Sequence, residues 1–121
     1  MILVDTSVWI DHLHKSDEVL IDLLLTDSVA THPLVIEELA LGSLARRDEV
    51  LQMMTGLSTV GTLDHLELLA LVDERRLWGK GLSPADAHLL GSALLSSDTR
   101  IWSRDKRLQS AADDLALSYV P

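Results

Sequence analysis

The stretch Met1-Ile2-Leu3-Val4-Asp5-Thr6-Ser7 decides the fold, because an apolar run is followed at once by a carboxylate and two hydroxyls. Residues 2–4 are predicted to form a short buried strand, and the following residues begin a helix that covers 8–14. Asp5 is therefore expected at the carboxyl end of a strand, where parallel α/β sheets bind ligands. Asp and Ser are also common helix caps, so Asp5 alone does not define a site.

Short apolar stretches alternate with helical patterns along the rest of the chain. This alternation predicts an α/β fold with a central parallel sheet of about five short strands and right-handed crossovers. In the longest helical pattern, Leu66, Leu69 and Leu77 follow helical spacing, so we expect that helix to pack one face on the sheet. The predicted strands are 2–4, 28–31, 57–60, 100–103 and 117–120, and the predicted helices are 8–14, 17–25, 33–44, 48–54, 63–78, 84–95 and 106–115.

Length and composition predict one independently folding domain. A chain of 121 residues is long enough to bury a sizeable core. It contains no cysteine, which excludes disulfides, thiolate zinc sites and cysteine nucleophiles. No basic leader precedes the first apolar run, and no apolar stretch approaches the roughly 18 residues of a membrane span. We therefore expect a cytoplasmic protein with no membrane segment.

The net charge of −9 argues against broad nucleic-acid binding, because such proteins usually carry a basic stripe. A cluster of carboxylates that binds a divalent cation would account for part of this excess. The ten Lys and Arg residues are also not evenly spread, since they concentrate within 46–47, 75–80 and 100–107. Local contacts with RNA thus remain compatible with the composition.

Four acids are expected to meet at one edge of the sheet, since each follows a predicted strand or begins a predicted helix. They are Asp5, Glu38, Asp86 and Asp105. Each also has a simpler explanation as a cap or surface residue; Ser83 and Asp86, for instance, have capping-box spacing. Carboxylates brought together raise one another's pKa and usually need a cation to stay ionised. Ligands made only of oxygen favour Mg²⁺ or Mn²⁺ over zinc, and such ions support phosphodiester hydrolysis.

The chain resembles the PIN-domain ribonucleases and, within them, the VapC toxins of bacterial toxin-antitoxin pairs. The resemblance covers nearly the whole chain and implies a single PIN domain over 1–121, folded as a three-layer sandwich. It also implies a metal-dependent endoribonuclease with an RNA substrate, a cognate VapB-type antitoxin and a homodimer. The motifs that carry it are Asp5-Thr6-Ser7-Val8, Glu38-Leu39-x-x-Gly42, Asp86-Ala87-x-Leu89-Leu90-Gly91-Ser92-Ala93 and Ser103-Arg104-Asp105, the last with serine where threonine is commoner.

These motifs assign roles to individual residues. We expect Asp5, Glu38, Asp86 and Asp105 to be catalytic, with Asp5, Asp86 and Asp105 holding the metal directly or through water. Ser7 and Ser103 are expected to support the site, and the basic residues that flank Asp105 are candidates for contacts with RNA phosphates: Arg104, Lys106 and Arg107.

Some neighbouring residues are harder to assign. Adjacent helical residues point about 100° apart, so only one of Glu37 and Glu38 can face the site. The Leu-x-x-Gly context favours Glu38. We expect Asp11 and Asp98 to be solvated, and the five histidines show no spacing typical of zinc ligands.

Two other functions compete with the nuclease hypothesis. A phosphoacceptor receiver domain is also acidic, of similar length and dependent on Mg²⁺. It requires an Asp at the end of a central strand, whereas the strand ending at Val60 is followed by Gly61-Thr62-Leu63. The second alternative is an inactive PIN-like binding module, which the presence of all four acids makes the weaker hypothesis.

Overall fold

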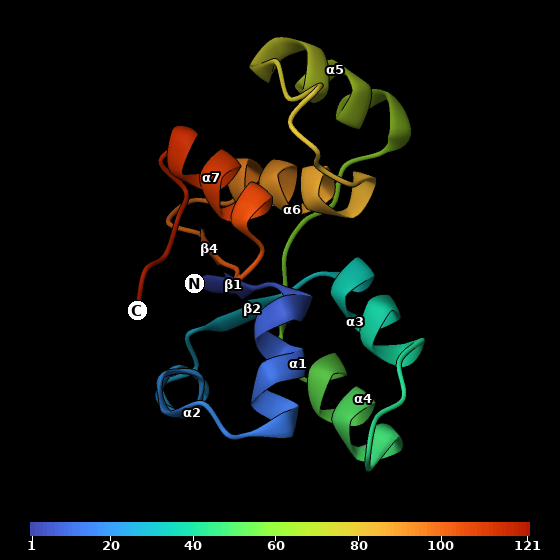
Figure 1. The fold of residues 1–121 in the computed structure, drawn as a ribbon, viewed down its shortest axis with the longest axis vertical. Helices are drawn as coiled ribbons and strands as arrows, with labels where there is room; N and C mark the ends of the chain where they lie inside the picture. Colours follow the sequence, from blue (N-terminus) through green and yellow to red (C-terminus); the bar gives the residue numbers. More distant parts are fainter.

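A parallel sheet of four short strands lies in the middle of the molecule (Figure 1). The structure is a computed structural model that describes residues 1–121. Every strand pair is parallel, so the carboxyl ends of all four strands share one edge. The strands follow the spatial order β3-β2-β1-β4 and comprise β1 (Ile2–Val4), β2 (Val29–Thr31), β3 (Ser58–Thr59) and β4 (Arg100–Trp102).

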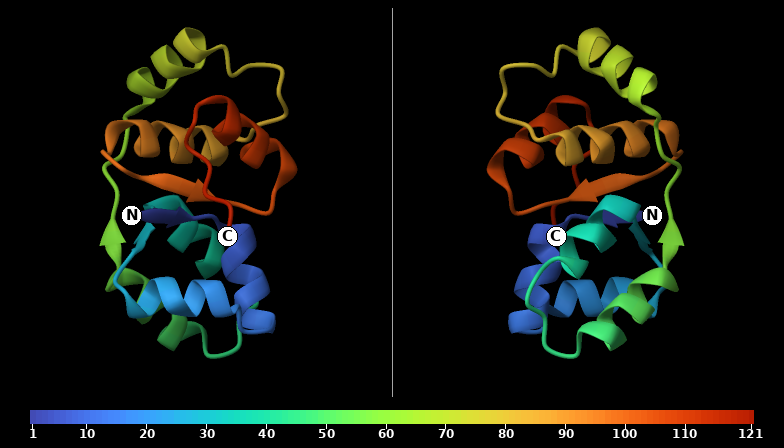
Figure 2. Two further views of the ribbon diagram at one scale, coloured as in Figure 1. Left: turned by 90° about the vertical axis from the view of Figure 1, so that its left-hand side faces the viewer. Right: turned by 90° about the vertical axis from the view of Figure 1, so that its right-hand side faces the viewer.

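Seven helices lie on the two sides of this sheet. Figures 1 and 2 show α5, α6 and α7 on one side and α1 to α4 on the other, which confirms the predicted three-layer α/β architecture. The helices are α1 (Thr6–His14), α2 (Glu18–Leu25), α3 (Pro33–Ala40), α4 (Arg47–Thr55), α5 (His65–Arg75), α6 (Pro84–Leu95) and α7 (Lys106–Asp114).

The first strand is central and places Asp5 directly at the shared edge. In the register of the sheet, Ile2 pairs with Val29 of β2, and Val4 pairs with Trp102 of β4. The amide of Asp5 continues this ladder by donating to the carbonyl of Trp102 at 2.9 Å. Helix α1 begins at the next residue. The opening strand and helix therefore fix where Asp5 lies relative to β4.

The sheet has one strand fewer than the sequence predicted. Residues 117–120 make only an isolated parallel bridge, between Ile101 and Ser118. Their backbone bonds run from Ile101 to Leu117 and from Tyr119 to Ile101, so they engage a single residue of β4. A short, largely apolar segment can thus lie beside a strand without extending the ladder.

Two helices, α3 and α5, are shorter than predicted by four residues or more, and α5 packs on another helix rather than on the sheet. Helix α3 ends at Ala40 rather than at residue 44. Helix α5 begins after a capping box at Asp64 and ends where Arg76 takes a left-handed conformation, with φ of 54°. It packs on α6, which separates it from the sheet, and it leaves Leu66 and Leu69 74% and 48% exposed. The prediction that this helix packs on the sheet was therefore wrong.

Helix α6 packs closely against α5 on one side and against the core on the other, and this packing fixes its position. An ideal Cβ on Gly91 of α6 would lie 2.7 Å from Leu63 Cδ1 and 2.9 Å from Leu71 Cδ2. Glycine therefore allows the close approach of these two helices. Leu89, Leu90 and Ala93 of α6 belong to the buried core that joins the sheet to its helices. None of the helices combines the length and the apolar content needed to cross a membrane.

Candidate active site

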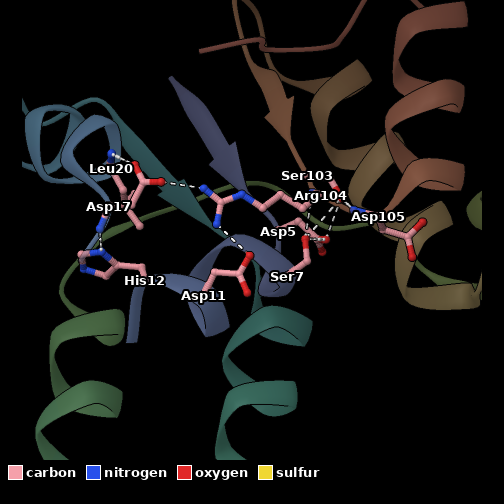
Figure 3. Close-up of polar contacts among 9 residues, drawn as sticks. All are labelled: Asp5, Ser7, Asp11, His12, Asp17, Leu20, Ser103, Arg104 and Asp105. Carbon is pink, nitrogen blue, oxygen red and sulfur yellow. Dashed lines mark hydrogen bonds and ion pairs between the residues drawn. The ribbon is translucent and has the colours of Figure 1, made fainter. Parts of the chain in front are cut away.

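Asp5 is buried at the carboxyl end of β1, with 7% of its surface exposed. Although it occupies the N-cap position of α1, its side chain makes no capping bond. Instead, Oδ2 accepts hydrogen bonds from the hydroxyls of Ser7, at 2.6 Å, and Ser103, at 2.8 Å (Figure 3). The two hydroxyls orient this carboxylate, and its Oδ1 has no hydrogen-bond partner in the protein.

Glu38 reaches the same place from α3. That helix starts at an N-cap formed by His32, whose Nδ1 accepts a bond from the amide of Leu34 at 3.0 Å. The hydroxyl of Thr6 donates to Glu38 Oε1 at 3.0 Å, and Glu38 lines the same pocket as Asp5. Glu37 is exposed and does not line that pocket. Of the two adjacent glutamates, the structure therefore places Glu38 at the site.

Asp86 and Asp105 cap helices and also face the pocket. Asp86 forms a capping box with Ser83, in which the Ser83 amide donates to Asp86 Oδ2 at 3.0 Å. Asp105 Oδ1 accepts bonds from the amides of Arg107 and Leu108, both at 3.0 Å. Capping and participation in the site are therefore compatible, because a cap occupies only one carboxylate oxygen.

The four acids surround one open pocket and share a common arrangement. Each carboxylate is held by the protein through one oxygen, while its second oxygen has no protein partner: Oδ1 of Asp5, Oε2 of Glu38, Oδ1 of Asp86 and Oδ2 of Asp105. No three of these side chains are close enough to enclose an ion by themselves. The pocket is lined by Asp5, Thr6, Ser7, Ile10, Glu38, Gly81, Ser83, Asp86 and Asp105.

The electrostatics reflect this crowding of negative charge. Partial burial raises the pKa of Glu38, and the charges of Asp5 and Asp86 raise it further, although the hydrogen bond from Thr6 opposes them. Burial also raises the pKa of Asp86, assisted by the charges of Asp5 and Asp105 and opposed by the bonds from Ser83. The acids thus interact with one another, as expected for carboxylates that share a site.

Comparison with known proteins identifies the family. The family profile described as PIN domain matches residues 2–114. The chain belongs to the PIN-domain family. This PIN domain is 55% identical over 120 residues to "Ribonuclease VapC32" from two strains of Mycobacterium tuberculosis, CDC 1551 / Oshkosh and ATCC 25618 / H37Rv, with 99% of this chain and 97% of the relative covered. Family membership excludes the receiver-domain alternative.

A solved structure also resembles this PIN domain. The crystal structure of PAE2754 from Pyrobaculum aerophilum superposes with a TM-score of 0.64 and covers 91% of this chain and 83% of its own. The two sequences are 20% identical, so this likeness shows the shared fold alone.

The three basic residues around Asp105 differ in their surroundings. The guanidinium of Arg104 pairs with Asp11 and Asp17, at 2.8 and 2.5 Å. Arg107 has no acidic partner, and its side chain lies against Gly81 on the pocket wall, where an added Cβ would be 2.8 Å from Arg107 Cδ. Lys106 is exposed and makes no ion pair. Of the three residues predicted to contact phosphates, Arg104 is thus the one that already forms ion pairs within the protein.

The sequence did not indicate some of the groups that organise this PIN domain. Thr6 belongs to the motif Asp5-Thr6-Ser7-Val8, but nothing in its pattern linked it to Glu38, 32 residues away. Asp11 was expected to be solvated, and its side chain is 57% exposed, but it also pairs with Arg104. Nothing in the sequence singled out Asp17 as a partner of Arg104. The only available signals were local: Asp11 lies on the predicted first helix, and Asp17 lies at a predicted helix start.

Proposed function

We propose that this PIN domain is a metal-dependent endoribonuclease, the toxin of a VapBC-type toxin-antitoxin pair. The observation that carries the proposal is the set of four carboxylates around one pocket, each oriented through one oxygen and free at the other. The relatives that bear the name ribonuclease support RNA as the substrate. An inactive PIN-like binding module remains the alternative that cleavage assays must exclude.

The donor set fits a hard divalent cation, Mg²⁺ or Mn²⁺, because every candidate ligand is a carboxylate oxygen. We assign Asp5, Asp86 and Asp105 as ligands, directly or through water. Mg²⁺ usually takes only one or two protein carboxylates and keeps several waters, so the open spacing of the acids is compatible with it. When bound, such a cation supplies activation of a water molecule and neutralisation of charge at the scissile phosphate.

The remaining groups have roles that follow from their contacts. Glu38, held by Thr6 and with a raised pKa, is our candidate for the base that takes a proton from the attacking water at its free oxygen. Ser7 and Ser103 keep the Asp5 carboxylate in one orientation. Arg107 and Lys106 are proposed to bind RNA phosphates, since both are exposed beside Asp105 and carry no ion pair.

The proposed antitoxin has a suitable binding surface next to the acids. An apolar groove lined by Ile10, Leu13, Leu39 and Leu44 also includes Glu38, and Ile10 and Glu38 line the acidic pocket as well. An antitoxin segment with apolar side chains followed by Arg or Lys would fill the groove and pair with the carboxylates. Binding of this kind would block the site from RNA and metal.

A homodimer is the other proposed assembly. Three apolar side chains on or next to α5 are exposed, namely Leu66, Leu69 and Trp78, at 74%, 48% and 61%. Leu66 and Leu69 lie three residues apart on α5, and exposed apolar side chains that share a helix face are typical of contact surfaces. Sedimentation velocity over a wide concentration range is expected to show a dimer, and Leu66→Glu with Leu69→Glu is expected to dissociate it. Only monomer at every concentration would overturn this assignment.

The decisive experiment is RNA cleavage by purified protein with Mg²⁺ or Mn²⁺. Structured and unstructured RNAs are compared, with EDTA and Asp5→Ala as negative controls. Asp73→Ala, which removes an exposed acid on α5, is the matched control that should cleave like the wild type. Metal-dependent cleavage that is lost only in Asp5→Ala supports the proposal. No cleavage by protein that intact mass shows to be free of antitoxin favours the binding module.

A further inference from the structure

The loop of residues 103–105, between β4 and α7, is bonded to Asp5 through two hydroxyls. The amide of Arg104 donates to Ser7 Oγ, and the amide of Asp105 donates to Ser103 Oγ, both at 3.0 Å. Each hydroxyl in turn donates to Asp5 Oδ2. A hydroxyl that accepts from an amide directs its own proton elsewhere, so both protons point at Asp5. The position of this loop therefore fixes the orientation of the Asp5 carboxylate.

The side chain of Arg104 ties the same loop to two helices. Nη1 donates to Asp11 Oδ2 on α1 at 2.8 Å, and Nη2 donates to Asp17 Oδ2 at the start of α2 at 2.5 Å. The guanidinium carbon lies 5.6 Å from the ring centre of Trp102, the last residue of β4. In Figure 3 this side chain runs away from the Asp105 carboxylate toward both partners. The guanidinium thus joins α1, α2 and β4 outside the acidic pocket.

Asp17 is itself held in a fixed position. Its Oδ1 accepts a bond from the amide of Leu20 at 3.0 Å, and its own amide donates to Nδ1 of His12 at 2.9 Å. The Leu20 amide, together with the Arg104 guanidinium, lowers the pKa of Asp17, so this carboxyl stays charged. The guanidinium is planar and lies between two carboxylates, of which Asp17 is itself held by its bonds to Leu20 and His12. The guanidinium therefore has little freedom to rotate.

We propose that Arg104 is a positioning residue of the nuclease site: by fastening the 103–105 loop to Asp11 and Asp17, it orients Asp5 and Asp105. This inference rests on the proposed function and assigns a role within the same site. Arg104 acts at a distance from the pocket, through Ser7 and Ser103, and it does not touch the RNA.

A direct contact between Arg104 and phosphate is the competing assignment. For that contact the guanidinium would have to leave both carboxylates, which breaks two charge-assisted bonds and leaves two acids unpaired near the RNA. A contact between Arg107 and phosphate breaks no ion pair, since Arg107 has no acidic partner. The two arginines therefore have different expected effects when replaced, and these effects can be measured in parallel.

Kinetics and metal binding of Arg104→Ala and Arg104→Lys test the proposal. Residues that orient a metal ligand typically change metal affinity or activity by about 10- to 100-fold. We expect both variants to lower kcat by about that factor with little change in KM for a short labelled RNA. We also expect weaker Mn²⁺ binding by the RNA-free protein, measured by titration calorimetry. We expect Arg104→Lys to be impaired as well, because a single ammonium does not reproduce the planar pair of bonds that the guanidinium makes to the two carboxylates.

The partner carboxylates provide an independent test. Asp11→Asn with Asp17→Asn keeps Arg104 and removes the charges that hold it. If Arg104 positions the loop, this double variant loses activity and Mn²⁺ affinity as Arg104→Ala does. If Arg104 binds phosphate, releasing it leaves cleavage intact or improves RNA binding, which overturns the proposal. Rescue by Arg104→Lys, or a raised KM with unchanged kcat and a weaker salt dependence of RNA binding, overturns it as well.

Controls separate this inference from the proposed function. Arg75→Ala removes an exposed arginine on α5 that makes no ion pair and should behave like the wild type in every assay. Thermal unfolding identifies variants that lose the fold, and the isosteric asparagine pair keeps the test valid if Arg104→Ala is unstable. Absence of cleavage by the wild type contradicts the proposed function. Cleavage by the wild type with unimpaired Arg104 and asparagine variants contradicts only the positioning role.

Discussion

The Thr6 hydroxyl donates a 3.0 Å hydrogen bond to Glu38 Oε1 and so joins the first turn of α1 to α3. We therefore predict that Glu38→Gln lowers RNA cleavage by more than about 100-fold, beyond the range typical of residues that only orient a ligand. Thr6→Val, which removes the orienting bond, is expected to fall within that range, at about 10- to 100-fold. Single-turnover cleavage rates at saturating Mn²⁺ measure both effects.

Glu37→Gln is the matched control for this prediction, because it makes the same chemical change one residue earlier. It should cleave at the wild-type rate. A large loss in Glu37→Gln combined with an active Glu38→Gln would show that the other glutamate serves the site.

The raised pKa of Asp86 predicts that neutralising this residue stabilises the metal-free protein. A carboxyl whose pKa is raised on folding contributes stability that is present below its ordinary pKa of 3.8 and is lost as the pH rises through the raised value. Asp86→Asn should therefore have a higher Tm than the wild type at pH 7 in EDTA, and the difference should shrink as the pH falls toward 4. Added Mn²⁺ should stabilise the wild type more than the variant.

Thermal melts at several pH values, with EDTA and with Mn²⁺, test this prediction. Asparagine keeps an oxygen that can accept from the Ser83 amide, so the capping box is preserved. A lower Tm of Asp86→Asn at pH 7 in EDTA would contradict this prediction. It would mean that the charge of Asp86 stabilises the capping box by more than its burial and its repulsion with the neighbouring acids destabilise the fold.

The sequence was sufficient to place the four acids near one edge of the sheet, because three of them lie at a strand end or a helix start and Glu38 lies in the helix that follows β2. Asp5 follows an unbroken apolar run, and Ser83-Pro84 marks the start of α6 unambiguously. Parallel strands then bring such residues to one edge without any knowledge of side-chain contacts. This is why both the fold class and the acidic pocket could be anticipated.

Contacts between distant segments were beyond this kind of prediction. The pairing of Arg104 with Asp11 and Asp17 spans 93 and 87 residues, and nothing local distinguishes these acids from solvated ones. Similarly, the apolar spacing in α5 indicated a buried face but not that α6 would lie between it and the sheet. Periodicity reports which face of a helix is apolar, whereas the covering element depends on tertiary packing.

The close approach of α5 and α6 predicts that Gly91 tolerates no larger side chain. Gly91→Val should lower the free energy of unfolding by about 1–3 kcal/mol, the usual cost of overpacking a core, because Leu63 and Leu71 already occupy the space. Urea denaturation measures the loss. Leu95→Val introduces the same residue at an exposed position, 60% accessible, near the end of the same helix and should cost much less. Equal stability of the two variants would contradict the packing argument.

The apolar groove predicts which substitution separates antitoxin binding from catalysis. Leu13→Glu places a charge in the groove and should weaken binding of the co-expressed antitoxin by at least about tenfold, or 1.4 kcal/mol, without lowering RNA cleavage. Leu25→Glu makes the same change on α2 at a position 79% exposed and outside the groove, and should bind normally. Tight binding by both variants would place the antitoxin on another surface.

The unpaired state of Arg107 predicts a change in the salt dependence of RNA binding. Each phosphate contact that is lost should make the slope of log K against log salt shallower by about 0.7 for single-stranded RNA. Arg107→Ala should show this change, and Lys106→Ala should show it if the ammonium also reaches a phosphate. Binding is measured with Asp5→Ala as the background so that the RNA stays intact. An unchanged slope in Arg107→Ala would remove the guanidinium beside Gly81 from the RNA-binding surface, even if cleavage were impaired.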